Sequence, residues 1–169
     1  MELETAIRTR RTHKAYGLEP VPREVLEELL ELARWAPNHH LTEPWRFRVL
    51  GPETLERLIA AGGPSEAAKL RRAPTLVVAS RRRSGDPHED HEDALATACA
   101  VYAVLLGAHA RGLASYWRTP RLLQGAEGRA AVGLEEDEEF VALIHLGTAV
   151  TNPAAKERKP LRDYVSFLP

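Results

Sequence analysis

The sequence is poor in several residue types, and each scarcity excludes something. Its 169 residues contain a single cysteine, Cys99, so neither an internal disulfide nor a site with several thiolate ligands can form within the chain. Lysine and arginine number 23, and aspartate and glutamate number 24, which gives a formal net charge of −1. A nearly neutral chain has no global field that would attract nucleic acid or an anionic membrane.

Long apolar segments are also scarce. The N-terminal residues "MELETAIRTRR" are charged and contain no apolar stretch of the signal-peptide type. The longest apolar run, residues 94–110, is interrupted by Thr97, Gly107 and His109 and is shorter than a membrane span requires. We therefore expect a soluble, cytoplasmic protein with no membrane or nucleic-acid partner.

Heat-labile side chains are few, with two asparagines, one glutamine and one methionine. Most of the basic charge is arginine, and 12 residues are proline. Charge-rich surfaces with few labile side chains are typical of heat-adapted proteins, so we expect a thermophile-like chain. A melting temperature in the ordinary mesophile range would contradict this expectation.

Hydrophobic periodicity predicts one α+β domain over residues 1–169, without repeats or an internal linker. Helices are predicted at residues 2–11, 23–36, 53–61, 65–72, 94–110 and 119–132, and strands at 45–51, 74–80, 112–118 and 140–147. The 94–110 helix is apolar on every face, so we expect neighbours all round it. Residues 81–93 are predicted to form an exposed loop, 135–139 a solvated acidic corner, and the last 22 residues an arm.

The segment "RTRRTHK", residues 8–14, places four basic residues and two hydroxyls within seven positions at the end of a predicted helix. Arginine can grip phosphate oxygens in a bidentate manner, and a hydroxyl adds a short hydrogen bond. Two interpretations stay open: a phosphate-binding segment, or a solvated basic face, which is the commoner origin of such a cluster.

The segment "YWRTP", residues 116–120, follows the apolar helix and Gly112. At the end of a short strand, Arg118 and Thr119 would provide a second phosphate contact beside the aromatic wall of Trp117. The alternative is that Trp117 packs on the core with Arg118 at its rim.

The segment "HEDHED", residues 88–93, looks like a metal site because acids surround two histidines three positions apart. It lacks the His-Glu-x-x-His spacing that puts two histidines on one helical face, and it is too charged to be buried. A solvated helix start, with acids near the helix N-terminus, explains it better.

The segment "RWAPNHHLTEPWRF", residues 34–47, sets His39 and His40 between Pro37 and Pro44. A zinc site would need a third ligand, and the sequence nominates none. His39 and His40 could also act as a general base, but nothing in the sequence points to that role. We expect Pro37 to end the preceding helix and Pro44 to introduce a core strand.

Four segments in a fixed order carry a family pattern: "RRTHKAY", "APNHHLTEPWRF", "GLASYWR", and "HLGTA" with a tail rich in lysine, arginine and proline. Together they resemble the FMN-dependent nitroreductase family, in particular its short subgroup, over essentially the whole chain. The usual signatures of that family are an Arg-Arg-Ser-x-Arg start and an Ala-Pro-Ser-x-x-x-x-Gln-Pro-Trp loop.

The resemblance implies a three-layer α+β sandwich with a central mixed sheet flanked by helices, and a homodimer with FMN at its interface. It implies an enzyme that passes hydride from NAD(P)H through FMN to a nitroaromatic, quinone or similar small-molecule acceptor by a ping-pong mechanism. FMN is then the cofactor and NAD(P)H the co-substrate. No metal and no catalytic protein residue are implied, since flavin N5 carries the hydride.

The resemblance also implies which residues bind FMN: Arg10, Arg11, Thr12, Lys14, Trp35, His39, Trp117, Arg118 and Thr119. The first three match positions that hold the phosphate and ribityl chain, and the fourth matches a position near the pyrimidine edge. The tryptophan–histidine pair matches positions through which the second subunit meets the flavin. The last three match a segment that closes on the phosphate end, and Arg158 matches a tail arginine that reaches the phosphate in longer members. His40 is expected to face solvent or the substrate mouth.

Three departures from the family pattern concern flavin contacts and acceptor choice. Leu41 and Glu43 stand where many members have asparagine and glutamine, and Ala103 stands where the central helix often has asparagine. Two other functions remain as alternatives. One is a flavin protein without reductase activity, acting in substrate oxidation, flavin storage or flavin chemistry. The other is a phosphate- or RNA-binding module, which the near-neutral charge disfavours.

Overall fold

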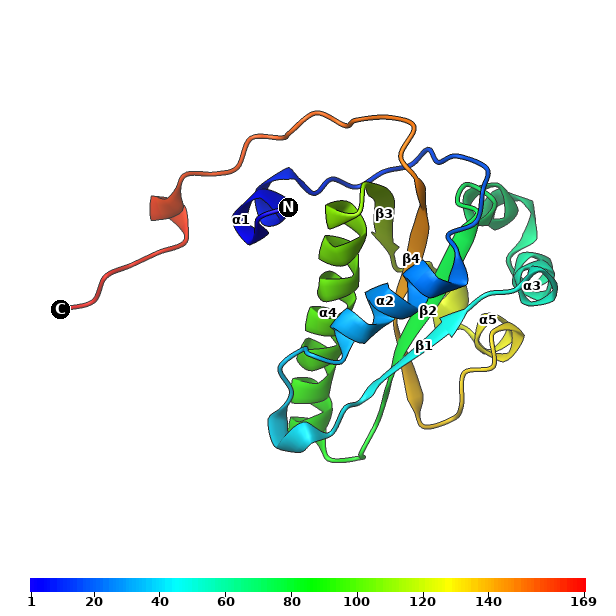
Figure 1. Cartoon of the computed structure of the whole chain (residues 1–169). Coiled ribbons are helices and arrows are strands. Elements are labelled where there is room, and N and C mark those ends of the chain that lie inside the picture. The colour runs from blue at the N-terminus through cyan, green and yellow to red at the C-terminus, as the bar shows by residue number, and fades with distance from the viewer.

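The computed structural model describes residues 1–169 and shows an α+β fold in three layers (Figure 1). Its elements are α1 (Leu3–Thr9), α2 (Arg23–Ala33), β1 (Trp45–Val49), α3 (Pro52–Leu70), β2 (Thr75–Arg82), α4 (Pro87–Ala110), β3 (Leu113–Arg118), α5 (Ala126–Ala131) and β4 (Glu138–Thr148). Short 3₁₀ turns occur at His39–Leu41, Arg121–Gln124 and Leu161–Asp163. The predicted order of helices and strands is confirmed.

The sheet has the strand order β1-β2-β4-β3, and each neighbouring pair is antiparallel. The expectation of a mixed sheet is therefore wrong for the four strands. Strands β2 and β3, which α4 connects, run in the same direction. They do not pair with each other, because β4 lies between them and runs opposite to both. Parallel pairing is limited to an isolated bridge between Thr12 and Ser115.

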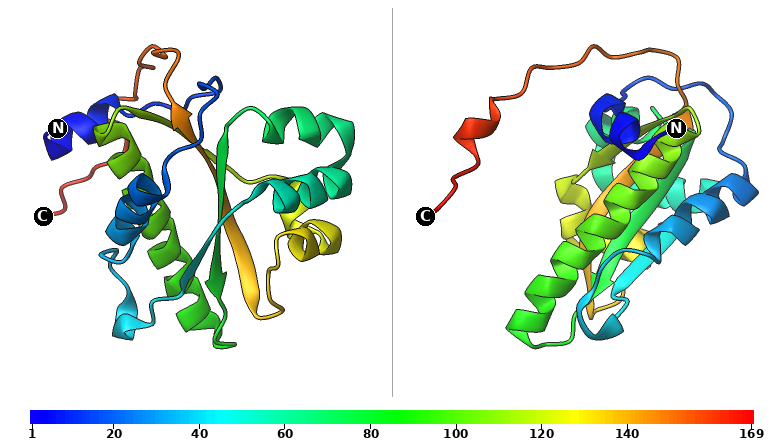
Figure 2. Two further views of the ribbon diagram at one scale, coloured as in Figure 1. Left: turned by 45° about the vertical axis from the view of Figure 1, so that its right-hand side comes forward. Right: turned by 60° about the vertical axis from the view of Figure 1, so that its left-hand side comes forward.

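Helices cover both faces of the sheet because side chains alternate along each strand (Figure 2). On one face, α2 and α4 pack on residues such as Val77 and Ile144. On the other, α3 and α5 pack on residues such as Val78 and Leu143. The helices α2 and α4 approach so closely that a Cβ on Gly107 would collide with Leu32.

Helix α4 begins earlier than predicted. The side chain of Asp86 accepts hydrogen bonds from the backbone N–H groups of His88 and Glu89, so the 24-residue helix starts at Pro87 instead of residue 94. By length and composition alone, α4 could cross a membrane. Half of its most apolar stretch, however, is buried inside the fold.

Helix α4 also lacks the neighbours on all sides that its composition suggests. One side packs on the sheet and α2, whereas Leu95 is 57 % exposed and Cys99 and Tyr102 are also exposed. Together with half-buried Leu106, these residues form a stripe, here called the α4 stripe, at the spacing of one helical face. Within one chain nothing covers this stripe.

Two segments predicted to be solvated contain ion pairs in which one member is buried. Strand β2 continues through Arg81, a buried residue whose guanidinium lies 3.0 Å from Asp90 and 2.5 Å from Glu139. Glu138 in the acidic corner is only 2 % exposed, and its carboxylate lies 2.7 Å from the guanidinium of Arg48 on β1. Charge composition alone cannot reveal the pairs Arg81–Glu139 and Arg48–Glu138, because their members are 58 and 90 positions apart in the chain.

Two further segments refine the predicted boundaries. Helix α3 is kinked at Gly63, which has a φ of +68°, and Pro64, so the two short helices predicted there are present. The helix predicted at 119–132 is instead a 3₁₀ turn and α5, separated at Gly125. The C-terminal segment extends away from the body as a mostly exposed arm, as predicted (Figure 1).

Candidate functional site

The segment after α1 is bound to the sheet by its backbone. The N–H of His13 donates to the carbonyl of Ser115 on β3 at 3.1 Å, and the N–H of Gly17 donates to the carbonyl of Thr148 at 3.0 Å. The hydroxyl of Tyr16 donates to the carbonyl oxygen of His13 at 2.7 Å. These bonds fix residues 10–14 beside the end of β3.

A cleft of about 520 Å³ opens at this point. Its walls are Arg10, Arg11, Thr12, Lys14, Tyr116, Pro153, Ala154, Lys156 and Arg158. The sequence prediction of Arg10, Arg11, Thr12 and Lys14 as one group therefore agrees with their positions, and Arg158 joins them. We call this the basic cleft.

The five cations of the basic cleft have no acidic partner within 4.0 Å. Arg11 donates to the carbonyls of Arg8 and Arg10 at 2.7 and 2.9 Å, and so caps the end of α1. The other four form no side-chain hydrogen bond within the chain. Five positive groups around one cleft, without a counter-ion from the protein, suit an anion of high charge such as a phosphate dianion.

Four wall residues of the basic cleft were not predicted as site residues, and two of them, Tyr116 and Lys156, carry polar side-chain groups. Tyr116 comes from β3 and belongs to the segment 116–120, but it directly precedes the three residues of that segment that were expected to bind FMN. Lys156 comes from the arm, two positions before Arg158. A basic pair spaced two apart in an extended segment puts both side chains on one side, and this signal was available in the sequence.

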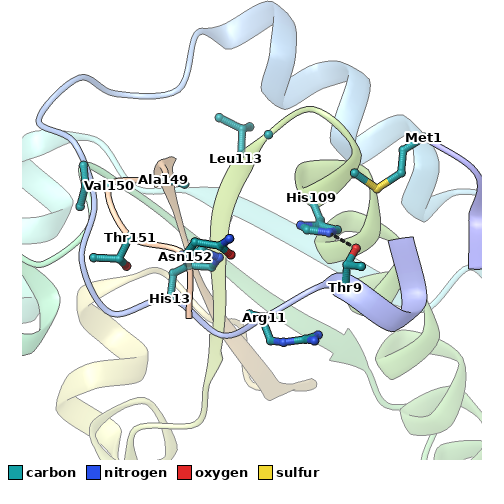
Figure 3. A pocket seen from close by; sticks show the side chains of 11 residues that line it. Met1, Thr9, Arg11, His13, His109, Leu113, Ala149, Val150, Thr151 and Asn152 are labelled. Carbon is teal, nitrogen blue, oxygen red and sulfur yellow. Dashed lines mark hydrogen bonds between the residues drawn. The ribbon is translucent and has the colours of Figure 1, made fainter. Parts of the chain in front are cut away.

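A second cavity of about 470 Å³ adjoins the basic cleft, and Arg11 lines both (Figure 3). His13, His109, Thr9 and Asn152 contribute polar groups to it. Burial lowers the pKa of both histidines, and the nearby charge of Arg10 lowers each further. Both imidazoles are therefore neutral at neutral pH and add nothing to the positive charge beside them.

The segment 117–119 divides between three environments. Trp117 packs against the core formed with α2 and α4. Arg118 points to the opposite face, where its guanidinium lies 3.1 Å from the carboxylate of Glu66 on α3. Thr119 is exposed. Neither Trp117 nor Arg118 lines the basic cleft in one chain.

A buried histidine lies on the same face as Arg118. His145 on β4 is fully enclosed between the rings of Tyr16 and Tyr116, at centroid distances of 6.4 and 5.8 Å. Neither ring nitrogen has a hydrogen-bond partner. Burial, followed by the charges of Arg118 and Arg72, lowers the pKa of His145 to about 3.

His39 lies at the other end of α4, and Trp35 precedes it by four positions in the chain. Trp35 is 80 % exposed directly after α2, which ends at Ala33 before Pro37 as expected. The Nδ1 atom of His39 lies 2.8 Å from Oε2 of Glu92, and its ring stacks on that of His40 at 3.9 Å. His40 is exposed, and β1 starts at Trp45 directly after Pro44, as predicted.

The predicted flavin residues are therefore not gathered in one chain. The basic cleft adjoins His109 through Arg11, whereas His39 is attached to Glu92, 17 positions earlier on α4. At 1.5 Å per residue the two helix positions are about 26 Å apart.

The sequence matches the profile of the Nitroreductase family over residues 7–62 and 61–148. It is 30 % identical over 177 aligned positions to a Bacillus subtilis protein with the provisional name NAD(P)H nitroreductase YfhC, covering 95 % of this chain and 91 % of that protein. The chain belongs to the nitroreductase family.

Solved structures agree with this membership in the nitroreductase family. A nitroreductase-like family protein from Bacillus cereus superimposes with a TM-score of 0.90 at 23 % identity, covering 99 % of this chain and 96 % of the other. A nitroreductase-type protein from Desulfovibrio desulfuricans, solved in complex with FMN, superimposes with a TM-score of 0.83 at 28 % identity, covering 98 % and 96 %.

This member of the nitroreductase family differs from the common pattern at two places in the loop and one in α4. Leu41 and Glu43 are exposed, and Ala103 is half-buried on α4.

The segment 88–93 forms the first turns of α4, with His88 3.6 Å from Glu92. No group of three or more His, Cys, Asp or Glu side chains is placed to hold a metal ion.

Proposed function

We propose that the chain is a cytoplasmic, homodimeric FMN-dependent oxidoreductase that uses NAD(P)H to reduce a nitroaromatic, quinone or similar acceptor. The observation that carries this proposal is the basic cleft, with its five cations and no acidic partner. Family membership and the FMN bound by the Desulfovibrio relative support the same cofactor.

The residues of the basic cleft fit FMN. A phosphate group with close to two negative charges needs several charge-assisted donors, and Arg10, Lys156 and Arg158 provide uncommitted ones. Thr12 adds a hydroxyl donor for the phosphate or the ribityl chain. Lys14, at the same cleft, supplies the cation that stabilises negative charge at the pyrimidine edge of a reduced flavin. A volume of about 520 Å³ is in the range of cofactor sites.

Bound FMN would supply the hydride transfer, accepting a hydride from NAD(P)H and giving it to the acceptor in a second, separate half-reaction with ping-pong kinetics. The chain's own residues would bind and orient the flavin and the two substrates. No general acid or base of the protein is required, because the flavin carries the hydride.

The α4 stripe and the divided site support the proposed homodimer. An antiparallel pairing of two α4 helices that sets Leu95 against the partner's Leu106 also sets Cys99 against the partner's Tyr102. The same register brings Glu92, and with it His39, to the end of the helix where the partner's His109 lies. Trp35 and His39 would thereby reach the basic cleft of the second chain, and the exposed apolar side chains would be covered.

Of the segment 117–119, we propose Thr119 as the flavin-side group, since its hydroxyl is free at the end of β3. Trp117 would support the site by packing on the core, and Arg118 would support it by its ion pair with Glu66.

Titration of cofactor-free protein with FMN, followed by quenching of flavin fluorescence, tests the proposal. Loss of one charge-assisted contact costs about 1.5–3 kcal/mol, so Arg10→Ala and Arg158→Ala should each weaken FMN binding by roughly 10- to 100-fold. Arg121→Ala removes one exposed arginine outside the cleft and is the matched control.

Steady-state oxidation of NAD(P)H separates a reductase from a flavin protein of another kind. Turnover with a nitroaromatic or quinone acceptor and parallel double-reciprocal lines are expected. Protein that binds FMN but shows no turnover would have a non-reductase role, and protein that binds no FMN would contradict the proposal entirely.

A further inference from the structure

The loop between α2 and β1 has an unusual backbone. His40 and Leu41 have φ values of +53°, and Glu43 has a φ of +43°. Residues other than glycine rarely adopt this left-handed conformation, and a leucine there is particularly unfavourable because its Cβ crowds the following carbonyl group. Such a conformation persists only where surrounding contacts hold it.

Three side-chain contacts hold this loop. The amide oxygen of Asn38 accepts a hydrogen bond from the N–H of Glu43 at 3.0 Å, which closes the loop on itself. The hydroxyl of Thr42 donates to Oδ1 of Asp93 at 2.6 Å, and His39 meets Glu92 at 2.8 Å. The last two contacts attach the loop to α4.

The Thr42–Asp93 contact differs from the other attachment in its burial. Asp93 is only 4 % exposed and forms no ion pair, whereas the His39–Glu92 pair is open to water. A buried carboxylate without a hydrogen bond is costly, so the hydroxyl of Thr42 satisfies Asp93 as much as Asp93 holds Thr42. The side chains that the loop presents are by contrast exposed, with Leu41 at 79 %.

We propose that Asp93 is a positioning residue, which through Thr42 holds the left-handed loop so that His39 and the adjoining Trp35 meet the flavin of the partner chain. This role rests on the proposed function, because it requires a cofactor across the dimer. The contacts that carry it lie apart from the basic cleft of the same chain, which is at the other end of α4.

Substitution of Thr42 tests the role with little change of shape. Thr42→Val removes the donor and leaves Asp93 unpaired, whereas Thr42→Ser keeps the hydroxyl. Asp93→Asn removes the charge but keeps a carbonyl acceptor for Thr42. Thr54→Val on α3, whose hydroxyl accepts from Arg57 on the opposite face of the sheet, is the matched control.

Two readouts are combined. Amide hydrogen exchange of residues 38–43 in cofactor-free protein measures how firmly the loop conformation is held. The Kd for FMN measures whether the loop contributes to flavin binding. Thr42→Val should speed exchange in the loop and raise the Kd for FMN about tenfold, with the dimer intact. In the Thr42→Ser and Asp93→Asn variants, the exchange rate of the loop and the Kd for FMN should stay within about threefold of the wild-type values. Thr54→Val should change neither quantity.

The outcomes distinguish the two claims. If wild-type protein binds no FMN, the proposed function fails. If wild type binds FMN but Thr42→Val binds it equally well, the positioning role alone is overturned, whether or not loop exchange changes. If Thr42→Ser binds FMN as weakly as Thr42→Val does, the positioning role is also overturned, because the loss of the hydroxyl would then not be what weakens binding.

Discussion

The Nε2 atom of His109 lies 2.7 Å from the hydroxyl oxygen of Thr9, and this contact determines which ring nitrogen carries the proton. The same hydroxyl lies 2.6 Å from the carbonyl oxygen of Thr5, which can only accept. Thr9 therefore donates to Thr5 and accepts from His109, so neutral His109 is the Nε2–H tautomer. The bond joins the last turn of α4 to the residue before Arg10.

Thr9→Val should destabilise the fold by about 0.5–1.5 kcal/mol, because it removes both hydrogen bonds while keeping the branched shape. Denaturant unfolding measures the change, and Thr9→Ser should retain most of the stability. Since Arg10 follows directly, the Kd for FMN should also rise severalfold. Equal unfolding midpoints for Thr9→Val and wild type would show that the contact is too exposed to matter.

Leu95→Glu should prevent dimerisation, because it places a charge in the apolar α4 stripe, at the position proposed to face the partner's Leu106. The molar mass from light scattering should fall to that of one chain, and FMN retention should fall with it. Leu18→Glu, at a 91 % exposed position outside the stripe, should change neither. A monomeric Leu95→Glu protein that binds FMN normally would show that one chain holds the complete site.

Arg118→Met should destabilise the fold more than it weakens FMN binding. Glu66, which is largely buried, would lose the partner at 3.1 Å and keep only Lys69 at 2.6 Å. A loss of about 1–3 kcal/mol is expected, with partial recovery in the double variant Arg118→Met/Glu66→Gln. If FMN binding instead falls as far as in Arg10→Ala without loss of stability, Arg118 contacts the phosphate, as the family resemblance implied.

Stability should fall as the pH is lowered from about 6.5 towards 5. Burial is the main cause of the lowered pKa of His13, His109 and His145, with neighbouring arginines adding to it. Because the unfolded chain takes up protons near pH 6.5 and the folded chain does not, protonation favours unfolding in this window. His145, whose pKa is about 3, alone accounts for about 2 kcal/mol between pH 6.5 and 5.

His145→Leu tests this assignment. Both ring nitrogens of His145 lack a partner, so leucine should cost little at pH 7.5 and should flatten the dependence of unfolding free energy on pH. The lowered pKa values of Glu66 and Glu138 act only below about pH 4.5, outside the window. An unchanged slope in His145→Leu would assign the pH effect to other groups.

The sequence predicted most of the fold because hydrophobic periodicity is a local signal. The basic segment 8–14 is also a local signal, but the choice between a phosphate site and a solvated face came from the family resemblance, which implied Arg10, Arg11, Thr12 and Lys14 as a group. It could not predict that Arg118 pairs with Glu66, or that Glu138 is buried against Arg48, because these partners are 52 and 90 positions apart.

Misjudged boundaries also have local causes. The apolar pattern placed the start of α4 at residue 94, whereas the interpretation of 88–93 as a solvated helix start was right, and Asp86 followed by Pro87 is a recognisable helix start. The left-handed loop was not foreseen, since leucine and glutamate carry no signal for that conformation.

The arm gives the basic cleft an unusual construction. Lys156 and Arg158 line the cleft, yet the hydrogen bonds formed by residues 153–169 are all internal to that segment. An anion gripped by Arg10 on the body and Arg158 on the arm would be the main tie between them. Trypsin cutting after Lys156, Arg158 or Arg162 would thus measure cofactor occupancy, with the loaded protein cut slowly and the empty protein trimmed to its core.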